Sequence, residues 1–231
     1  ITNKRRLFMK KIMVVSAHPD DEILGCGGTL IKHRDLGDKI DWLITTNISE
    51  NQGFSKARVN SRQEEILAVE KRLKINKTYK LNYPTMCLSD ESLLTMIPEI
   101  SKIFNESKPE VIYILNRSDA HSDHLITFKA VMACTKSFRY PFIKRILMYE
   151  CISETEFGPV LPENHFLPTY YVDVSPFFQE KIDIMSIYES EIGEHPFPRS
   201  NRNIEALATF RGASIGVEYA EAFQLIKYID K

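Results

Sequence analysis

The sequence lacks the cysteine patterns of a thiolate metal site or of a disulfide framework. Its four cysteines, Cys26, Cys87, Cys134 and Cys151, are scattered through 231 residues and form no C-x-x-C pair. Thiolate zinc sites and disulfide-rich folds need closely or regularly spaced cysteines, so neither is indicated. Scattered cysteines fit a reducing compartment, and we expect a cytoplasmic protein.

Long hydrophobic runs are also missing. No stretch reaches the roughly 18 apolar residues that a membrane-spanning helix needs. The basic start from Ile1 to Lys11 has no apolar segment of the kind found in signal peptides. We therefore expect neither a membrane anchor nor export.

Neither sign of charge is in excess. The chain has 30 Lys and Arg residues and 31 Asp and Glu residues, which gives a formal net charge of −1. This balance offers no electrostatic reason to expect nucleic acid or an anionic membrane as the main partner. The expected partner is a small-molecule substrate, and the sequence is also compatible with a homo-oligomer.

No repeat, low-complexity tract or linker divides the chain, which is long enough for one sizeable core. We expect a single domain over residues 11–231. Residues 1–10 are expected to be a disordered extension. Because Met9 stands just before the first apolar run, residues 1–8 are interpreted as a remnant upstream of the native start.

Apolar runs alternate with helical stretches along the chain. Strand-like runs cover residues 11–17, 39–46, 79–83, 111–115, 145–149 and 170–174, with helices between them and two more from about Phe178 and Asn203. This alternation is typical of βαβ units. It predicts an α/β fold, a Rossmann-like doubly wound, mostly parallel sheet with helices on both faces. The irregular stretch after Cys151, up to Pro168, is expected to be a loop that forms a rim or a lid of the site.

Acidic and imidazole side chains crowd together where the first predicted strand ends. His18, Asp20, Asp21 and Glu22 lie almost side by side in the sequence. Carboxylates so close together in a buried turn would repel one another unless a cation lay among them. A divalent metal ion is the simplest such cation.

A second polar cluster, which contains His121 and His124, follows the fourth predicted strand. In doubly wound sheets, ligands bind beyond the carboxyl ends of the strands where the strand order reverses. In the common arrangement that place lies between the first and fourth strands. We therefore expect the two clusters to converge in space.

Together the two clusters supply the ligands of a hydrolytic metal site. Two histidines and one aspartate leave a coordination position open for water, and we expect His18, Asp21 and His124 to be the ligands. Asp20 is expected to act as the general base, and His121 to donate a hydrogen bond or a proton. Spacing alone does not distinguish His121 from His124 as the ligand.

These motifs resemble the LmbE-like (PIG-L) family of metal-dependent N-acetylglucosaminyl deacetylases, which have a Rossmann-like fold. Residues 17–29 resemble the first family motif and residues 121–124 the second, and weaker similarities extend to residue 225. The resemblance implies that His18, Asp21 and His124 bind zinc. It also implies that Asp20 is the general base and that His121 assists the transition state.

The resemblance also implies sugar-binding residues. It points to Arg62 and, after the third predicted strand, to Asp90 as side chains that hold sugar hydroxyls. In the loop after the second strand, Ile48 stands where the family usually has glycine.

The expected function is that of a zinc-dependent hydrolase that removes an N-acetyl group from an amino-sugar-containing small molecule and releases acetate. Fe²⁺ or another divalent metal could replace zinc at such a site. One alternative is a metal-dependent hydrolase of another amide or of a phosphoester. Another is a non-catalytic sugar- or nucleotide-binding module on the same fold.

Other polar side chains have simpler interpretations. Asp119 and Asp123 are expected to be N-caps of the following helix, and Glu22 to complement the dipole of the first helix. His33 is expected to be exposed near a helix C-terminus. Arg211 is expected either to order the site from behind or to form a structural ion pair with a glutamate such as Glu218.

Overall fold

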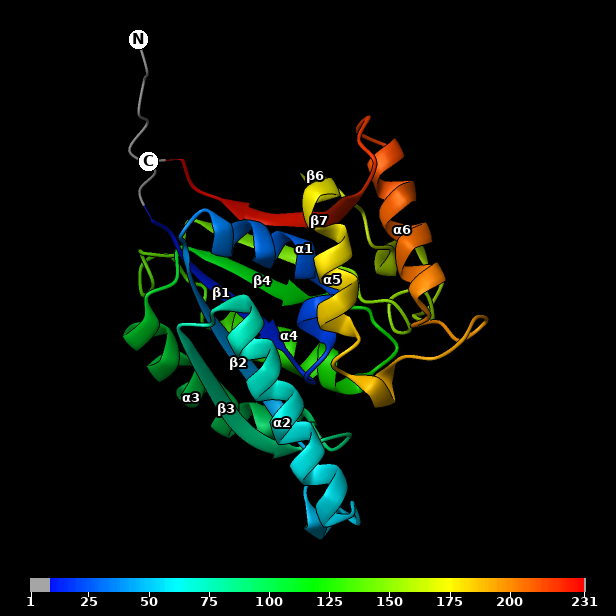
Figure 1. Ribbon diagram of the computed structural model, residues 1–231. Coiled ribbons are helices and arrows are strands. Elements are labelled where there is room, and N and C mark those ends of the chain that lie inside the picture. The colour runs from blue at the N-terminus through cyan, green and yellow to red at the C-terminus, as the bar shows by residue number, and fades with distance from the viewer. Residues whose placement is uncertain (1–8, 231) are drawn as a thin grey trace.

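One sheet of seven strands runs through residues 9–230, the part of the chain that the computed structural model describes. The strand order is β3-β2-β1-β4-β5-β7-β6 (Figure 1). The first five strands are parallel, and β7 is antiparallel to both β5 and β6. The strands are β1 (Lys11–Ser16), β2 (Lys39–Asn47), β3 (Lys77–Pro84), β4 (Val111–Leu115), β5 (Arg145–Tyr149), β6 (Tyr170–Asp173) and β7 (Ala220–Tyr228).

Helices cover both faces of the sheet (Figure 1). The helices are α1 (Asp21–Asp35), α2 (Lys56–Leu73), α3 (Leu93–Ser107), α4 (Ser122–Ala133), α5 (Phe178–Met185) and α6 (Asn201–Ala213). Buried side chains of α1, α2, α5 and α6 form one hydrophobic layer with the sheet, and those of α3 and α4 form the other. The predicted Rossmann-like α/β class, with a mostly parallel sheet and helices on both faces, is confirmed.

The strand order places the functional loops together. β1 pairs with β4, with Ile12 opposite Val111 and Val14 opposite Tyr113. The polypeptide leaves both strands at the same edge of the sheet, and the strand order reverses between them. The predicted neighbourhood of the first and fourth strands is therefore present.

Helix α1 is interrupted where the sequence is rich in glycine. Its backbone leaves helical geometry at Cys26, with φ −146° and ψ 22°. The N–H groups of Gly28 and Thr29 beyond the break donate to the buried carboxylate of Glu221 on β7. Lys181 of α5 donates to the Leu24 carbonyl before the break, and also to Glu221. A buried ion pair thus satisfies backbone groups that the break leaves free.

Of two local predictions, that for His33 is wrong and that for Arg211 holds with a different partner. His33 is mostly buried, because its Nδ1 lies 2.6 Å from Asp38 and its Nε2 2.8 Å from the Tyr113 hydroxyl. The ion pair expected between Arg211 and a glutamate is present, with two bonds at 2.6 and 2.8 Å, but its partner is Glu150 and not Glu218.

Two further expectations concern the N-terminal residues and the absence of a membrane-spanning helix. The interpretation of residues 1–8 lies outside the described residues, while Met9 and Lys10 have no regular secondary structure. No helix within residues 9–230 combines the length and the apolar character needed to cross a membrane.

Candidate functional site

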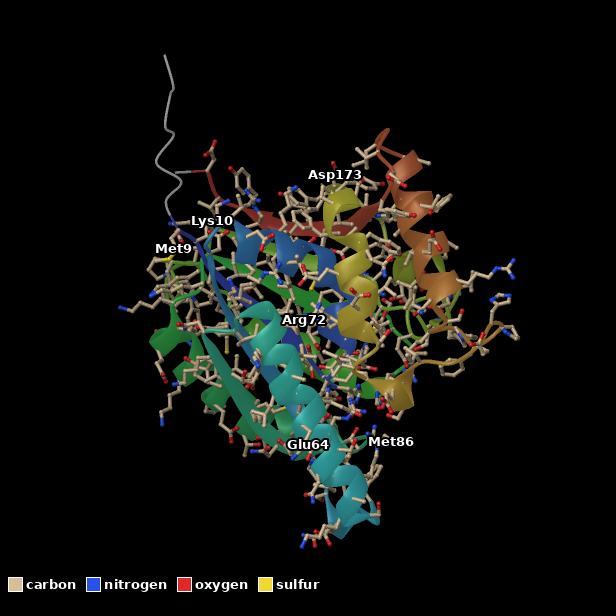
Figure 2. The ribbon with its side chains drawn as sticks, viewed as in Figure 1. Met9, Lys10, Glu64, Arg72, Met86 and Asp173 are labelled. Atoms are coloured by element: carbon tan, nitrogen blue, oxygen red, sulfur yellow. The ribbon has the colours of Figure 1, made fainter. Side chains whose placement is uncertain are left out.

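A cavity of about 350 Å³ opens at the carboxyl edge of the sheet, where the loops after β1 and β4 meet. Met86, labelled in Figure 2, lies on its lining. Its lining residues come from segments that are far apart in the sequence, within residues 18–24, 46–48, 54–62, 85–86 and 151–154, together with His121, Glu191 and Arg199.

His18 and Asp21 line this cavity, and the fully buried His124 lies next to Asp21. Each offers a donor atom, and the three donor atoms lie within 4.8 Å of one another. His124 Nε2 is 3.3 Å from Asp21 Oδ1, and His18 Nδ1 is 3.9 Å from Asp21 Oδ2. The structure therefore brings together the three side chains that were predicted as ligands.

Asp119 orients His124. The Asp119 carboxylate lies 2.8 Å from Nδ1 of His124, so this nitrogen carries the hydrogen and Nε2 keeps its lone pair. His124 is fully buried, and its Nε2 has no hydrogen-bond partner within the described residues. A buried lone pair that faces a carboxylate oxygen is unfavourable unless a cation lies between them. The residues present therefore fit a metal ion.

Asp123 orients His18 in a similar way. Its carboxylate lies 3.1 Å from His18 Nε2 and accepts the backbone N–H groups of Met86 and Leu88. This leaves Nδ1 of His18 directed to the cluster. The N-cap of α4 is His121, whose Nδ1 accepts the N–H of Asp123. The expectation that Asp119 and Asp123 are N-caps is wrong, because both bind histidine rings.

His18, His121 and Asp123 form a second set of three donors at similar spacing. Both Asp123 oxygens already accept backbone N–H groups, and the His121 Nδ1 lone pair is also occupied. In the first set, Nε2 of His124 has no such competitor. The geometry therefore favours His124 over His121 as the ligand, a choice that spacing left open.

The pKa shifts of Asp21 and His124 also support a cation at this cluster. Burial raises the pKa of Asp21, but the facing His124 and His18 outweigh it and hold that pKa below its ordinary value. Burial lowers the pKa of His124, yet Asp21 and Asp119 together raise it well above its usual range. Asp21 and Asp119 therefore favour a positive charge at His124, which either a proton on the ring or a divalent ion between His124 and Asp21 would supply.

Asp20 lies beside this cluster in an unusual backbone conformation, with φ 138° and ψ −30°. This φ is rare for a residue with a side chain and is retained only where neighbouring contacts impose it. Burial, with the nearby Asp21 and Glu191 carboxylates, raises the pKa of Asp20, whereas Arg199 and Arg62 lower it. A buried carboxyl with a raised pKa suits proton transfer.

Glu22 makes one of the contacts that hold Asp20 in this backbone conformation. Its side chain is buried and accepts hydrogen bonds from the Asp20 N–H at 3.1 Å, the Ser16 hydroxyl at 3.2 Å and the Tyr188 hydroxyl at 2.8 Å. Burial raises the pKa of Glu22 to about 7. The interpretation of Glu22 as a residue that complements the helix dipole missed these contacts, which hold the backbone of Asp20.

His121 lines the cavity, and its ring lies tilted against that of His18, with ring centroids 4.4 Å apart. Burial and the nearby His18 and His124 lower the pKa of His121 to about 4. Because Nδ1 accepts the Asp123 N–H, the ring hydrogen of the neutral form is on Nε2. His121 can therefore donate a hydrogen bond while uncharged.

Arg62 lines the same cavity, but its guanidinium is largely engaged. It donates to the Pro19 carbonyl at 2.5 Å and forms ion pairs with Glu65 and Glu191. Glu191 also binds Arg58 and Arg199. The sequence reasoning missed Glu191 and Arg199 as cavity residues, because no periodic pattern marks the turn that carries Glu191.

The structure does not bring Asp90 to the cavity. Its side chain is 75% exposed and pairs with Lys129 at 2.8 Å. Ile48 does lie on the cavity lining. From the 151–168 loop, Cys151, Ser153 and Glu154 contribute to the lining, as expected for a loop at the rim.

Comparisons with known proteins place the chain in a family. The profile of the GlcNAc-PI de-N-acetylase (PIG-L) family matches residues 13–135, which is more than half of the chain. An uncharacterized deacetylase of Escherichia coli K12, YaiS, is 31% identical over 153 residues, covering 64% of this chain and 75% of that protein.

Two archaeal proteins match over nearly the full length. The diacetylchitobiose deacetylase of Thermococcus kodakarensis is 22% identical over 227 residues, covering 94% of this chain and 84% of that protein. The solved structure of the N,N'-diacetylchitobiose deacetylase from Pyrococcus horikoshii, bound to an inhibitor, superposes with a TM-score of 0.75 at 21% identity. The superposition covers 94% of this chain and 84% of the Pyrococcus horikoshii chain. At this identity the structural likeness establishes the fold.

The expected kind of enzyme, an N-deacetylase, is confirmed by the family profile and the named relatives. The chain belongs to the PIG-L (LmbE-like) family of de-N-acetylases.

Proposed function

We propose that this chain is a zinc-dependent hydrolase that removes the N-acetyl group of an amino-sugar-containing small molecule and releases acetate. The observation that carries the proposal is the buried Nε2 of His124, which has no hydrogen-bond partner within the described residues and faces Asp21, a residue that lines the same cavity as Asp20 and His121. The names of the archaeal relatives, which deacetylate an N-acetylated sugar, support the substrate class.

The proposed metal ligands are His18, Asp21 and His124. Two imidazoles and one carboxylate suit Zn²⁺, and Fe²⁺ also accepts such a set. When bound, the ion would polarise the acetamide carbonyl and acidify water at its open position. The carboxylates of Asp119 and Asp123 keep the free lone pairs of the two imidazoles directed at the site.

Asp20 is the proposed general base. It is buried beside Asp21 and lines the cavity, so it can accept a proton from the attacking water and pass it to the leaving amine. Burial, Asp21 and Glu191 raise the pKa of Asp20, and Arg199 and Arg62 oppose that rise by favouring its ionised form.

His121 is the proposed hydrogen-bond donor to the oxygen that becomes negative during the attack. Its Nδ1 is occupied by a backbone N–H, so Nε2 carries the ring hydrogen. The sequence left open whether His121 donates a hydrogen bond or transfers a proton. This arrangement favours donation of a hydrogen bond by the neutral ring.

Arg62 is the proposed contact for sugar hydroxyls, since it lines the cavity and is fixed by Glu191 and Glu65. The four cysteines within the described residues are free thiols, and we propose the cytoplasm as the location. A phosphoester as the substrate is the competing proposal, because a metal and a base would serve either reaction.

Acetate release is the decisive assay. Metal-loaded protein would be incubated with N-acetylglucosamine, diacetylchitobiose, a nucleotide-linked N-acetylglucosamine and a phosphoester. We expect acetate and free amine from at least one of the sugars, and a loss of about 10²- to 10⁴-fold in Asp20→Asn. Phosphate release without acetate from any of the sugars would refute the proposal.

A further inference from the structure

A second cavity lies on the α1 face of the sheet, away from the deacetylase site. It has a volume of about 200 Å³. It lies between the C-terminal half of α1 and strands β4, β5 and β6. Figure 2 shows Lys10 and Asp173, which line it, in the upper part of the view and Met86, on the lining of the first cavity, in the lower part. None of its lining residues belongs to the proposed catalytic machinery.

Three cationic side chains line this second cavity: Lys10, Lys32 and Arg145. Among residues 9–230, no carboxylate oxygen lies within 4.0 Å of their charged groups. Lys32 Nζ donates to the Asp173 backbone carbonyl, and Arg145 to the Tyr170 hydroxyl at 3.0 Å. Their positive charges are therefore uncompensated by direct ion pairs, unlike those of Arg58, Arg62 and Arg199 in the first cavity.

The carboxylates nearby are turned to other partners. Asp173 accepts the N–H and the hydroxyl of Ser175, at 2.9 and 2.7 Å. Asp38 accepts the Lys10 backbone N–H at 2.8 Å and contacts His33. Asp173 interacts with Lys32, and Asp38 with Lys10, through space without a direct ion pair. No such interaction with Arg145 is found for either carboxylate within the described residues.

Hydroxyl groups add donors to the same lining. Thr29 is 2% exposed, and its Oγ1 has no hydrogen-bond partner within the described residues. Tyr170 accepts from Arg145 through its hydroxyl oxygen, which leaves the hydroxyl hydrogen available. A buried hydroxyl without a partner is costly, and a bound acceptor would satisfy it.

We propose that this second cavity is a binding site for the phosphate group of a small phosphorylated molecule, separate from the deacetylase site. Lys32 and Arg145 bind the phosphate oxygens, Lys10 adds positive charge, and the hydroxyls of Thr29 and Tyr170 donate to the same group. Guanidinium and ammonium groups without carboxylate partners favour phosphate, because charge-assisted hydrogen bonds are the strong ones.

The test measures binding of inorganic phosphate and of glycerol 3-phosphate to the full-length, metal-loaded protein by calorimetry. We expect saturable binding that weakens by at least about tenfold in Lys32→Met and in Arg145→Met. Arg145→Lys should recover part of the affinity. Lys102→Met, which removes an exposed lysine on α3 at the opposite face, should bind like wild type.

Deacetylation rates and unfolding temperatures of the variants provide the control for folding. We expect wild-type rates in Lys32→Met, since this residue lies outside the first cavity. The absence of binding by both probes would overturn the proposal. So would phosphate binding that persists in Lys32→Met but disappears in His124→Gln, because it would place the anion at the metal site.

Discussion

Among single residues, Glu22 has the widest influence on the proposed general base. Asp20 has a φ of 138°, and the Glu22 carboxylate accepts its backbone N–H while also accepting the hydroxyls of Ser16 and Tyr188. Removal of this acceptor would leave an unfavourable backbone conformation without one of its supports. Glu22 thus acts as a positioning residue for Asp20.

We predict that Glu22→Ala lowers kcat by about 10- to 100-fold with little change in KM, because a small displacement of a catalytic group is costly. Glu22→Gln keeps an acceptor for the Asp20 N–H and should retain most of the activity. The measurement is steady-state deacetylation at matched metal content.

Tyr188→Phe provides the matched control for this pair. It removes one hydroxyl donor to Glu22 but not the contact with Asp20, so kcat should stay close to that of wild type. Wild-type kcat in Glu22→Ala would show that the contact does not position the base.

At the level of elements, helix α1 links the metal site to the centre of the fold. Its first turn carries Asp21, and its break at Cys26 lets the helix pass close to β5. A Cβ at Gly25 would lie 2.1 Å from the Tyr149 ring, whereas one at Gly27 would meet flexible side-chain atoms at 3.2 Å. The glycines are therefore explained by close packing, which the sequence reasoning favoured over a phosphate-binding loop.

We predict that Gly25→Ala destabilises the fold by about 1–3 kcal/mol, the range found when extra atoms are forced into a packed core. Gly27→Ala should cost clearly less, since its nearest neighbours, in the side chains of Ile23 and Lys181, lie at 3.2 Å and not at 2.1 Å. Urea unfolding of both variants gives the comparison. Equal stability of the two variants would contradict the packing explanation.

Asp38, in the turn between α1 and β2, makes a pH-dependent contribution to the stability of the fold. Burial raises the pKa of Asp38, but the hydrogen bonds from His33 and the Lys10 N–H outweigh it and hold that pKa below its ordinary value. A lowered pKa in the folded state stabilises the protein above the unfolded-state pKa of about 4. That contribution is lost as the pH falls through the folded-state pKa.

We therefore predict that Asp38→Asn is less stable than wild type at neutral pH and that the difference shrinks below about pH 4. Unfolding free energies of both proteins, measured across this range at equal metal content, give the difference directly. A difference that is constant from neutral to acidic pH would argue against this role of Asp38.

For the whole molecule, the alternation of apolar runs and helical stretches predicted the class of fold and the adjacency of the first and fourth strands. Strand β7 was missed. It runs antiparallel between β5 and β6, so it is not part of a βαβ unit whose pattern would predict it. Its buried Glu221 also interrupts the apolar pattern that is typical of a buried strand. Glu221 is explained only by its partners Lys181, Gly28 and Thr29, which are distant in the sequence.

The candidate site could be predicted only in part, for a similar reason. His18, Asp21, His121 and His124 lie in short motifs at strand ends, where topology places them together. Asp123 was interpreted as a helix cap because local pattern does not reveal a contact with His18 across the sheet. Glu191 and Arg199 reach the cavity from the C-terminal region through tertiary contacts alone.

The central claim is that His18, Asp21 and His124 hold a metal ion while the neighbouring Asp20 moves protons. The most direct measurement is the metal content of purified wild type, His124→Gln and Asp20→Asn, taken with acetate release from the same samples. We predict about one metal ion per wild-type chain, little metal in His124→Gln, and wild-type metal content without activity in Asp20→Asn. Full metal content in His124→Gln, or full activity in Asp20→Asn, would contradict the account.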